Sequence, residues 1–217
     1  RDIYCIGKLN ANPIRSHIQM SFQLVFADDE KNQNGKYDRK ISILYKIGLI
    51  VEDLVQKGLN PQKSRVVVFC KLQDDTKKAT ELMKKKIEEI EGWKNIGVDY
   101  FHADRNTREK ETIIDKYRNG GITILFTTNA FGMGMDIPNI HYVYHLDPPD
   151  YIEDYLQEVG RAGRNEEAYR DAGFSEKKPI QAICYISEGV FKDQLDKTSI
   201  TWNDIETIYD AVKEFIS

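Results

Sequence analysis

The feature that most constrains the fold is a regular alternation between short apolar runs and longer segments of helical periodicity. Runs this short and this apolar are typical of parallel strands that are covered on both faces. Parallel strands need crossover connections, so the intervening helices are expected on both faces of a largely parallel sheet. The prediction is therefore an α/β fold. The apolar runs are residues 65–70, 97–101, 122–126, 140–144 and 180–186.

Further elements are expected around this alternation. Residues 18–26 alternate apolar and polar positions, which predicts a strand. Residues 40–57 carry apolar side chains at helical spacing, which predicts a helix. A helix is also expected from Asp150 to about Val159, after two prolines. The polar, charged stretch 165–179 is predicted to be a flexible loop.

Two of the predicted helices have candidate capping residues at their start. Asp74 or Asp75 is expected to cap the helix that follows the run at 65–70. Asn106 or Thr107 is expected to begin the next helix. Short side chains with an oxygen acceptor satisfy the free N–H groups of a first helical turn.

The domain organisation expected from these patterns has three parts. Residues 1–15 are an irregular lead-in, residues 16–187 form the α/β domain, and residues 188–217 form a helical extension with an amphipathic pattern. The sequence starts at Arg1 and its first methionine is Met20. We therefore expect the 217 residues to be a piece of a longer protein.

Charge and cysteine content exclude some classes of protein. With 31 Lys and Arg against 35 Asp and Glu, the net charge is −4, which disfavours a protein that coats nucleic acid by charge alone. Three scattered cysteines form no disulfide framework or four-ligand zinc site and suit a reducing compartment, cytoplasmic or nucleoid/nuclear. No apolar run reaches the ~20 residues of a membrane span, so no membrane partner is expected.

Two segments carry the functional signal. Residues 127–138 read T-T-N-A-F-G-M-G-M-D-I-P and directly follow a predicted strand. Residues 155–164 read Y-L-Q-E-V-G-R-A-G-R at a predicted helix end. These stretches resemble motifs five and six of the C-terminal motor domain of superfamily-two helicases, most closely the RecQ family, over roughly residues 64–186. The resemblance implies a RecA-like fold and a function in ATP-driven movement along DNA.

In the second segment, Arg161 and Arg164 are three residues apart, so on one helical turn they can converge on a single anion. Guanidinium groups stabilise a phosphoryl group in flight without titrating. We expect Arg164 to be the arginine finger, Arg161 a phosphate or interdomain contact, and Gln157 a residue that positions a water or phosphate oxygen. The alternative is a basic turn that pairs with Glu158 and Glu166.

In the first segment, Gly132 and Gly134 permit a turn that side chains would block, and Asp136 can accept from a ribose hydroxyl. Gly134 and Asp136 are therefore candidate nucleotide-binding residues. Thr128 resembles the family's threonine that contacts a nucleic-acid phosphate. The alternative for this segment is a tight strand-to-helix turn without a ligand.

Lys71 and His102 are weaker candidates for nucleic-acid contact. Lys71 stands in the place of the family's motif four, although Leu72 and Gln73 depart from its pattern. Residues 100–104, Y-F-H-A-D, resemble the family's Y-H-A-G stretch, with Asp104 where glycine is usual. His102 is equally compatible with a nucleic-acid contact and with a hydrogen-bonded loop histidine.

The sequence lacks two motifs that a complete motor needs. It contains no G-x-x-x-x-G-K-[ST] phosphate loop and no D-E-x-[HD] magnesium motif. ATP with Mg is the expected cofactor pair, with the metal ligands on a preceding motor domain of the same chain, and no metal site is expected here. We therefore expect the fragment alone to hydrolyse no ATP.

Two other functions are alternatives to an ATP-driven DNA motor. A DEAD-box RNA helicase typically carries H-R-x-G-R-x-x-R, and residues 156–159, L-Q-E-V, offer no His-Arg pair. A non-catalytic docking module on a motor fold is disfavoured because both arginines and Asp136 are present. The expected partners are single-stranded DNA or a duplex junction.

Overall fold

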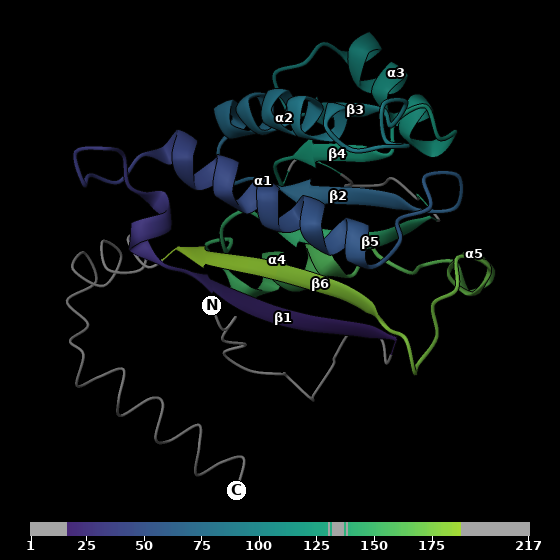
Figure 1. Ribbon diagram of the computed structural model, residues 1–217. Helices are drawn as coiled ribbons and strands as arrows, with labels where there is room; N and C mark the ends of the chain where they lie inside the picture. Colours follow the sequence, from purple (N-terminus) through teal and green to yellow (C-terminus); the bar gives the residue numbers. More distant parts are fainter. Residues whose placement is uncertain (1–16, 130, 132–136, 138, 188–217) are drawn as a thin grey trace, which may run out of the picture.

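The computed structural model describes residues 17–129, 131, 137 and 139–187. These residues form one six-stranded parallel sheet in the order β1-β6-β5-β2-β4-β3 (Figure 1). The predicted lead-in, the helical extension and the candidates Gly134 and Asp136 lie outside the described residues. The strands are β1 (Ile18–Val25), β2 (Arg65–Phe69), β3 (Val98–Phe101), β4 (Ile124–Thr127), β5 (Ile140–His145) and β6 (Ile180–Ser187).

Helices cover both faces of the sheet, as predicted. Two adjacent residues of β5 contact helices on opposite faces of the sheet, since neighbouring residues of a strand point to opposite faces. The Tyr144 hydroxyl donates to Asp53 of one helix, and the adjacent His145 contacts Glu158 of another. The helices are α1 (Arg39–Gln56), α2 (Gln73–Glu88), α3 (Thr107–Arg118), α4 (Ile152–Val159) and α5 (Glu166–Asp171), with the 3-10 helix η1 (Ala27–Glu30).

The first residues of α2 and α3 show which of the predicted caps form. Asn106 accepts from the Glu109 N–H at 2.9 Å and caps α3, as predicted. The expectation that Asp74 or Asp75 caps α2 is wrong, because Leu72 occupies the N-cap position without a side-chain bond. Asp75 is instead 1% exposed and accepts from the guanidinium of Arg39 on α1. A tertiary ion pair has replaced the local cap.

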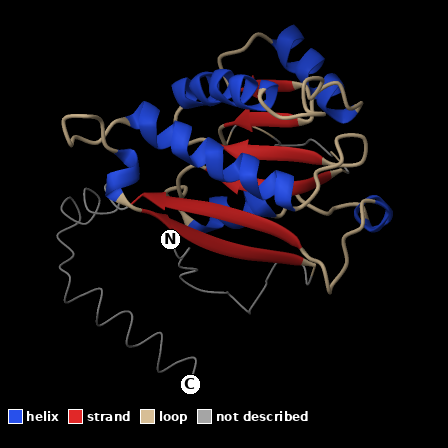
Figure 2. Cartoon of the chain, viewed as in Figure 1, coloured by secondary structure: helices blue, strands red, loops and turns tan. Residues whose placement is uncertain are grey.

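The stretch 165–179 was expected to be a flexible loop, and this expectation is wrong. Asn165 accepts from the Ala168 N–H at 2.9 Å and begins the six-residue helix α5 (Figure 2). Tyr169 and Phe174 of this stretch are buried. Their packing on the domain, rather than helical propensity in so short a segment, accounts for the ordered structure.

The parallel arrangement gives the sheet two distinct edges. The carboxyl edge is where β2, β4 and β5 end, at Phe69, Thr127 and His145. The amino edge is where β1, β5 and β6 begin. Ligands of open α/β sheets usually bind at the carboxyl edge. Among the described residues, no helix is both long enough and apolar enough to span a bilayer.

Candidate functional site

The candidate residues fall into two groups at opposite edges of the sheet. Thr128 and His102 follow β4 and β3 directly, and Lys71 lies two residues after the end of β2, all at the carboxyl edge. Arg161 and Arg164 follow α4, which runs from the carboxyl edge back across the sheet, and they lie at the amino edge. The two arginines therefore lie away from the carboxyl edge, where ligands of open α/β sheets usually bind.

At the carboxyl edge, Lys71 is paired within the domain. Its ammonium lies 2.5 Å from a carboxylate oxygen of Asp150, and both side chains are partly exposed. The two residues line a small cavity of about 90 Å³, which Asn129 and Asp154 also line. Exposed ion pairs contribute at most about 1 kcal/mol, so a phosphate oxygen can replace Asp150 as the partner of Lys71.

Thr128 lies in a turn that closes the end of β4. Its carbonyl accepts from the Thr127 hydroxyl at 3.0 Å and from the Phe131 N–H at 3.1 Å. The residue is buried, at 6% exposure, so it presents little surface to a ligand. The structure thus places Thr128 at the expected edge but below the surface.

His102 is also buried, at the end of β3, with 4% exposure. Neither ring nitrogen has a hydrogen-bond partner within the described chain, and the ring stacks on Tyr100 at 5.4 Å. Burial, followed by the positive charge of Lys77, lowers the pKa of His102. The side chain is therefore a neutral imidazole whose polar atoms lack the partners that buried groups usually find. Within the described residues the ring is therefore not a hydrogen-bonded loop histidine, and at 4% exposure it also presents little surface to a ligand.

The turn after α4 carries the two arginines, and the helix ends before them, at Val159. The expectation that both side chains lie on one helical turn and point to one side is wrong. Arg161 is buried, at 8% exposure, whereas Arg164 is exposed. Burial lowers the pKa of Arg161, and the positive charge of Arg164 lowers it further. The two charges are thus close enough to repel each other, while Gln157 is exposed on α4.

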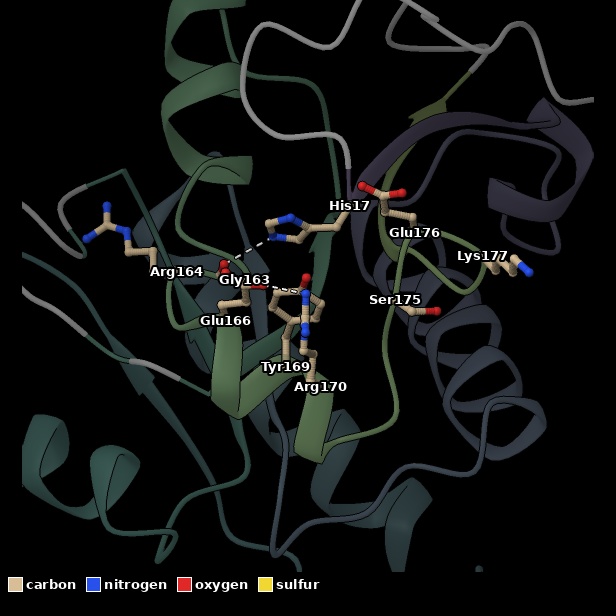
Figure 3. A pocket seen from close by; sticks show the side chains of 9 residues that line it. All are labelled: His17, Gly163, Arg164, Glu166, Tyr169, Arg170, Ser175, Glu176 and Lys177. Atoms are coloured by element: carbon tan, nitrogen blue, oxygen red, sulfur yellow. Dashed lines mark hydrogen bonds and ion pairs between the residues drawn. The ribbon is translucent and has the colours of Figure 1, made fainter.

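Backbone contacts fix this turn to the sheet. The Gly163 N–H donates to the Ile140 carbonyl at the start of β5, at 3.0 Å. The Gly163 carbonyl lies 3.1 Å from Nε2 of His17, just before β1. An open cavity of about 730 Å³ adjoins the turn, and Figure 3 shows Arg164 pointing away from the paired rings of His17 and Tyr169.

A buried ionic network beside the carboxyl edge was missed by the sequence reasoning. Lys46 of α1 is fully buried, and its ammonium donates to Asp147 at 3.0 Å and to Ser187 at 2.6 Å. Arg39 binds the same Asp147 through two nitrogens and extends the network to α2. Burial alone would raise the pKa of Asp147, but Arg39 and Lys46 outweigh it and lower this pKa.

One sequence signal could have revealed this network. One face of α1 is an apolar stripe that includes Ile43, Ile47 and Ile50. Lys46 lies on this same face, where an apolar residue is expected. A charge in the core stripe of a helix requires a buried partner of opposite sign. The partners are Asp147, Ser187 and the buried Glu30, whose carboxylate lies 3.5 Å from the ammonium, and no local pattern identifies them.

Comparisons with known proteins agree with this architecture. Residues 40–166, more than half of the chain, match the sequence profile of the helicase conserved C-terminal domain. The chain is 30% identical over 154 residues to a probable ATP-dependent RNA helicase DDX4 of Pelophylax lessonae, covering 69% of this chain and 18% of that protein. It is 27% identical over 116 residues to the ATP-dependent DNA helicase RecQ of Pasteurella multocida, covering 54% of this chain and 17% of that protein.

Among solved structures, the chain is similar to Mss116p bound to single-stranded RNA and AMP-PNP. The TM-score is 0.59 at 15% identity, covering 89% of this chain and 33% of that one. An identity this low supports the RecA-like fold alone. The chain spans less than a fifth of the length of the two curated relatives.

Proposed function

The chain belongs to the helicase conserved C-terminal domain family, and from this we propose that it is the second motor lobe of an ATP-dependent DNA helicase or translocase. DNA is favoured by the motif Y-L-Q-E-V-G-R-A-G-R at residues 155–164 and by the similarity to RecQ. RNA is the alternative track, since the relatives also include RNA helicases. In either case, activity belongs to the longer protein.

The observation that carries the proposal is the pair of arginines on the turn after α4. Arg164 is exposed on a turn whose backbone is bound to the sheet, and Arg161 lies buried beside it with a lowered pKa. An anion near both guanidinium groups would be stabilised by their two positive charges. A γ-phosphoryl group presented by a facing lobe has the required charge.

The proposed chemistry assigns separate roles to the two arginines. Arg164 reaches the γ-phosphoryl group of ATP and stabilises the charge that develops during its transfer to water. Arg161 is a phosphate or interdomain contact, and Gln157 orients a water or phosphate oxygen. Asp136 and Gly134, outside the described residues, remain candidate nucleotide-binding residues, with Asp136 accepting from a ribose hydroxyl.

The described residues do not fit a metal site. No group of three or more His, Cys, Asp or Glu side chains in this part of the chain is arranged to hold an ion. We therefore assign no step to magnesium in this lobe and expect its ligands in a preceding motor domain. The lobe on its own is expected to hydrolyse no ATP. A phosphate-release assay on the purified 217-residue chain with single-stranded DNA tests this, and nucleic-acid-stimulated turnover would contradict it.

The carboxyl edge is the proposed path of the nucleic-acid strand. Lys71 supplies a partly exposed cation there, and Thr128 and His102 lie below the surface of the same edge. Contacts to the sugar-phosphate backbone carry little sequence information. We therefore expect binding with weak sequence preference.

The arginine-finger role is tested with Arg164→Ala in the full-length protein. Loss of such a finger is expected to lower the rate of nucleic-acid-stimulated ATP hydrolysis by about 10³-fold. Binding of a non-hydrolysable ATP analogue is expected to persist. Arg170→Ala is the matched control, since Arg170 lines the same cavity but pairs with Glu166 at 2.5 Å. Equal hydrolysis by both variants would remove the finger assignment.

The choice of track is tested by unwinding assays on DNA and RNA duplexes with identical single-stranded overhangs. The proposal expects faster unwinding of DNA at equal protein concentration. Faster unwinding of RNA would favour the RNA helicase alternative. Binding of either strand without ATP hydrolysis by the full-length protein would favour the docking module.

A further inference from the structure

A histidine outside both helicase motifs lies directly against the turn that carries Arg164. His17 precedes β1, and its Nε2 lies 3.1 Å from the Gly163 carbonyl oxygen. A carbonyl only accepts, so Nε2 carries the proton and donates. The His17 ring stacks face to face on Tyr169 of α5, with centroids 4.4 Å apart and an interplanar angle of 8°. Figure 3 shows the His17 ring near both Gly163 and Tyr169.

Gly163 is held by both of its backbone polar groups. Its N–H is bound to Ile140 of β5 and its carbonyl to His17 of the β1 lead, so two strands position one residue. Its φ is +57°, and a Cβ here would lie 2.5 Å from Nε2 of His17 and 2.8 Å from Cδ1 of Ile180. The close fit leaves the turn little room to shift while His17 stays in place.

Arg164 follows Gly163 in the chain, so the contacts of Gly163 fix the position of the Arg164 backbone. Its Nε donates weakly to the Gly160 carbonyl, at 3.4 Å, and the side chain is exposed. The backbone of the turn therefore fixes the point from which the guanidinium extends. We propose that His17 is a positioning residue for Arg164, which holds the turn at the distance that the nucleotide in the facing lobe requires. This inference rests on the proposed function of Arg164.

Two contacts on one ring give this role its physical basis. The stack on Tyr169 fixes the plane of the imidazole, and the N–H···O bond then fixes the Gly163 carbonyl along that plane. Misplacing a catalytic group by about 1 Å can cost a rate factor of about 10². Since the Ile140 bond remains when His17 is replaced, we expect a smaller loss, about tenfold.

The experiment uses two variants of the full-length protein that separate the ring from the donor. His17→Phe keeps a ring to stack on Tyr169 and removes the N–H donor, whereas His17→Gln keeps a donor and removes the ring. For His17→Phe we expect kcat of DNA-stimulated ATP hydrolysis to fall about tenfold, with KM for ATP within about twofold. For His17→Gln we expect partial rescue, to within about threefold of the wild-type kcat.

Controls separate positioning from a general loss of structure. Tyr169→Leu removes the stack while keeping His17, and we expect kcat to fall about threefold. Phe174→Leu is the matched control, since Phe174 is a buried aromatic residue of the same segment that packs on Tyr142 instead. We expect it to lower the melting temperature and leave kcat within about twofold. Equal kcat losses in the Tyr169 and Phe174 variants would overturn the inference, and the Tyr169 variant decides the matter if His17→Phe does not fold.

A double variant shows whether the effect of the His17 substitution on ATP hydrolysis depends on Arg164. In an Arg164→Ala background, adding His17→Phe should leave single-turnover hydrolysis unchanged, because nothing is left to position. The same tenfold loss in both backgrounds would overturn the positioning role. If Arg164→Ala lowers hydrolysis and His17→Phe leaves it unchanged, the inference alone fails. If Arg164→Ala leaves hydrolysis unchanged, the proposed function fails with it.

Discussion

The two edges of the sheet hold their charged side chains in opposite ways. At the carboxyl edge, Arg39 and Lys46 reach inward and share the buried carboxylate of Asp147. At the amino edge, the backbone around Gly163 is fixed while the Arg164 side chain is exposed. The first arrangement uses cations to join α1 to the sheet. The second fixes the backbone from which an exposed cation extends. The same residue types thus serve stability at one edge and, as we propose, catalysis at the other.

The largest expected effect on stability comes from removing the shared carboxylate. Asp147→Ala removes the buried carboxylate that Arg39 and Lys46 share, which is expected to lower the free energy of unfolding by about 3 kcal/mol. The loss is limited because Asp75 still binds Arg39 and Glu30 still lies 3.5 Å from Lys46. Urea denaturation of the 217-residue chain measures this. Asp171→Ala is the control, because it breaks only the exposed pair with Lys63, worth at most about 1 kcal/mol. Similar losses in both variants would contradict the buried role of Asp147.

Measuring the free energy of unfolding against pH tests the buried side chain of His141 on β5. His141 is fully buried, with Nδ1 3.1 Å from the Ser64 hydroxyl, and burial, followed by the charge of Arg65, lowers its pKa to about 4. The unfolded chain takes up this proton near pH 6.5 and the folded chain only near pH 4, so stability falls as pH drops between these values. The loss is at most about 3 kcal/mol.

His141→Gln removes this titration and serves as the comparison for it. The difference in unfolding free energy between the wild-type chain and the variant is expected to shrink or change sign from pH 6.5 to pH 4. Urea denaturation at several pH values in this window measures the difference. A difference that is constant across the window would show that His141 is not the titrating group.

At the amino edge, Gly163→Ala tests how closely the turn is packed. Both the positive φ and the short distance from a Cβ to His17 oppose a side chain here, and we expect a loss of about 1–3 kcal/mol. Thermal and urea unfolding of the chain measure it. The matched control is Gly173→Ala, which shares a positive φ, at 86°, but meets no atom within 4 Å. A loss in Gly163→Ala no larger than in the control would show that backbone strain alone is responsible.

The smallest effect is expected at the exposed pair of the carboxyl edge. Asp150→Asn frees Lys71 from its partner and changes stability by less than about 1 kcal/mol. In the full-length protein we expect affinity for single-stranded DNA to rise about threefold, measured by fluorescence anisotropy at fixed salt. Asp154→Asn is the control for removing one negative charge from the same cavity. Equal gains in both variants would indicate a general charge effect without release of Lys71.

Local chemistry made some of these features predictable. The apolar runs identified the strands, and the Asn106 cap was predicted because capping is a contact between near neighbours. Asp75 was misassigned because its partner, Arg39, lies 36 residues away and outcompetes the local N–H groups. The helix α5 was missed because its stability comes from burial of Tyr169 and Phe174, and its six residues are too few for a helical period to stand out.

The sequence by itself determined the parallel α/β sheet, the order of the helicase motifs and the presence of two arginines on one turn, because each depends on residues close together in the chain. Only the tertiary structure decided which edge each candidate occupies, that Arg161 is buried while Arg164 is exposed, and that His17 contacts the turn 146 residues later. Contacts of this kind depend on which strands become neighbours. That choice is made by the packing of the whole sheet, which no short segment encodes.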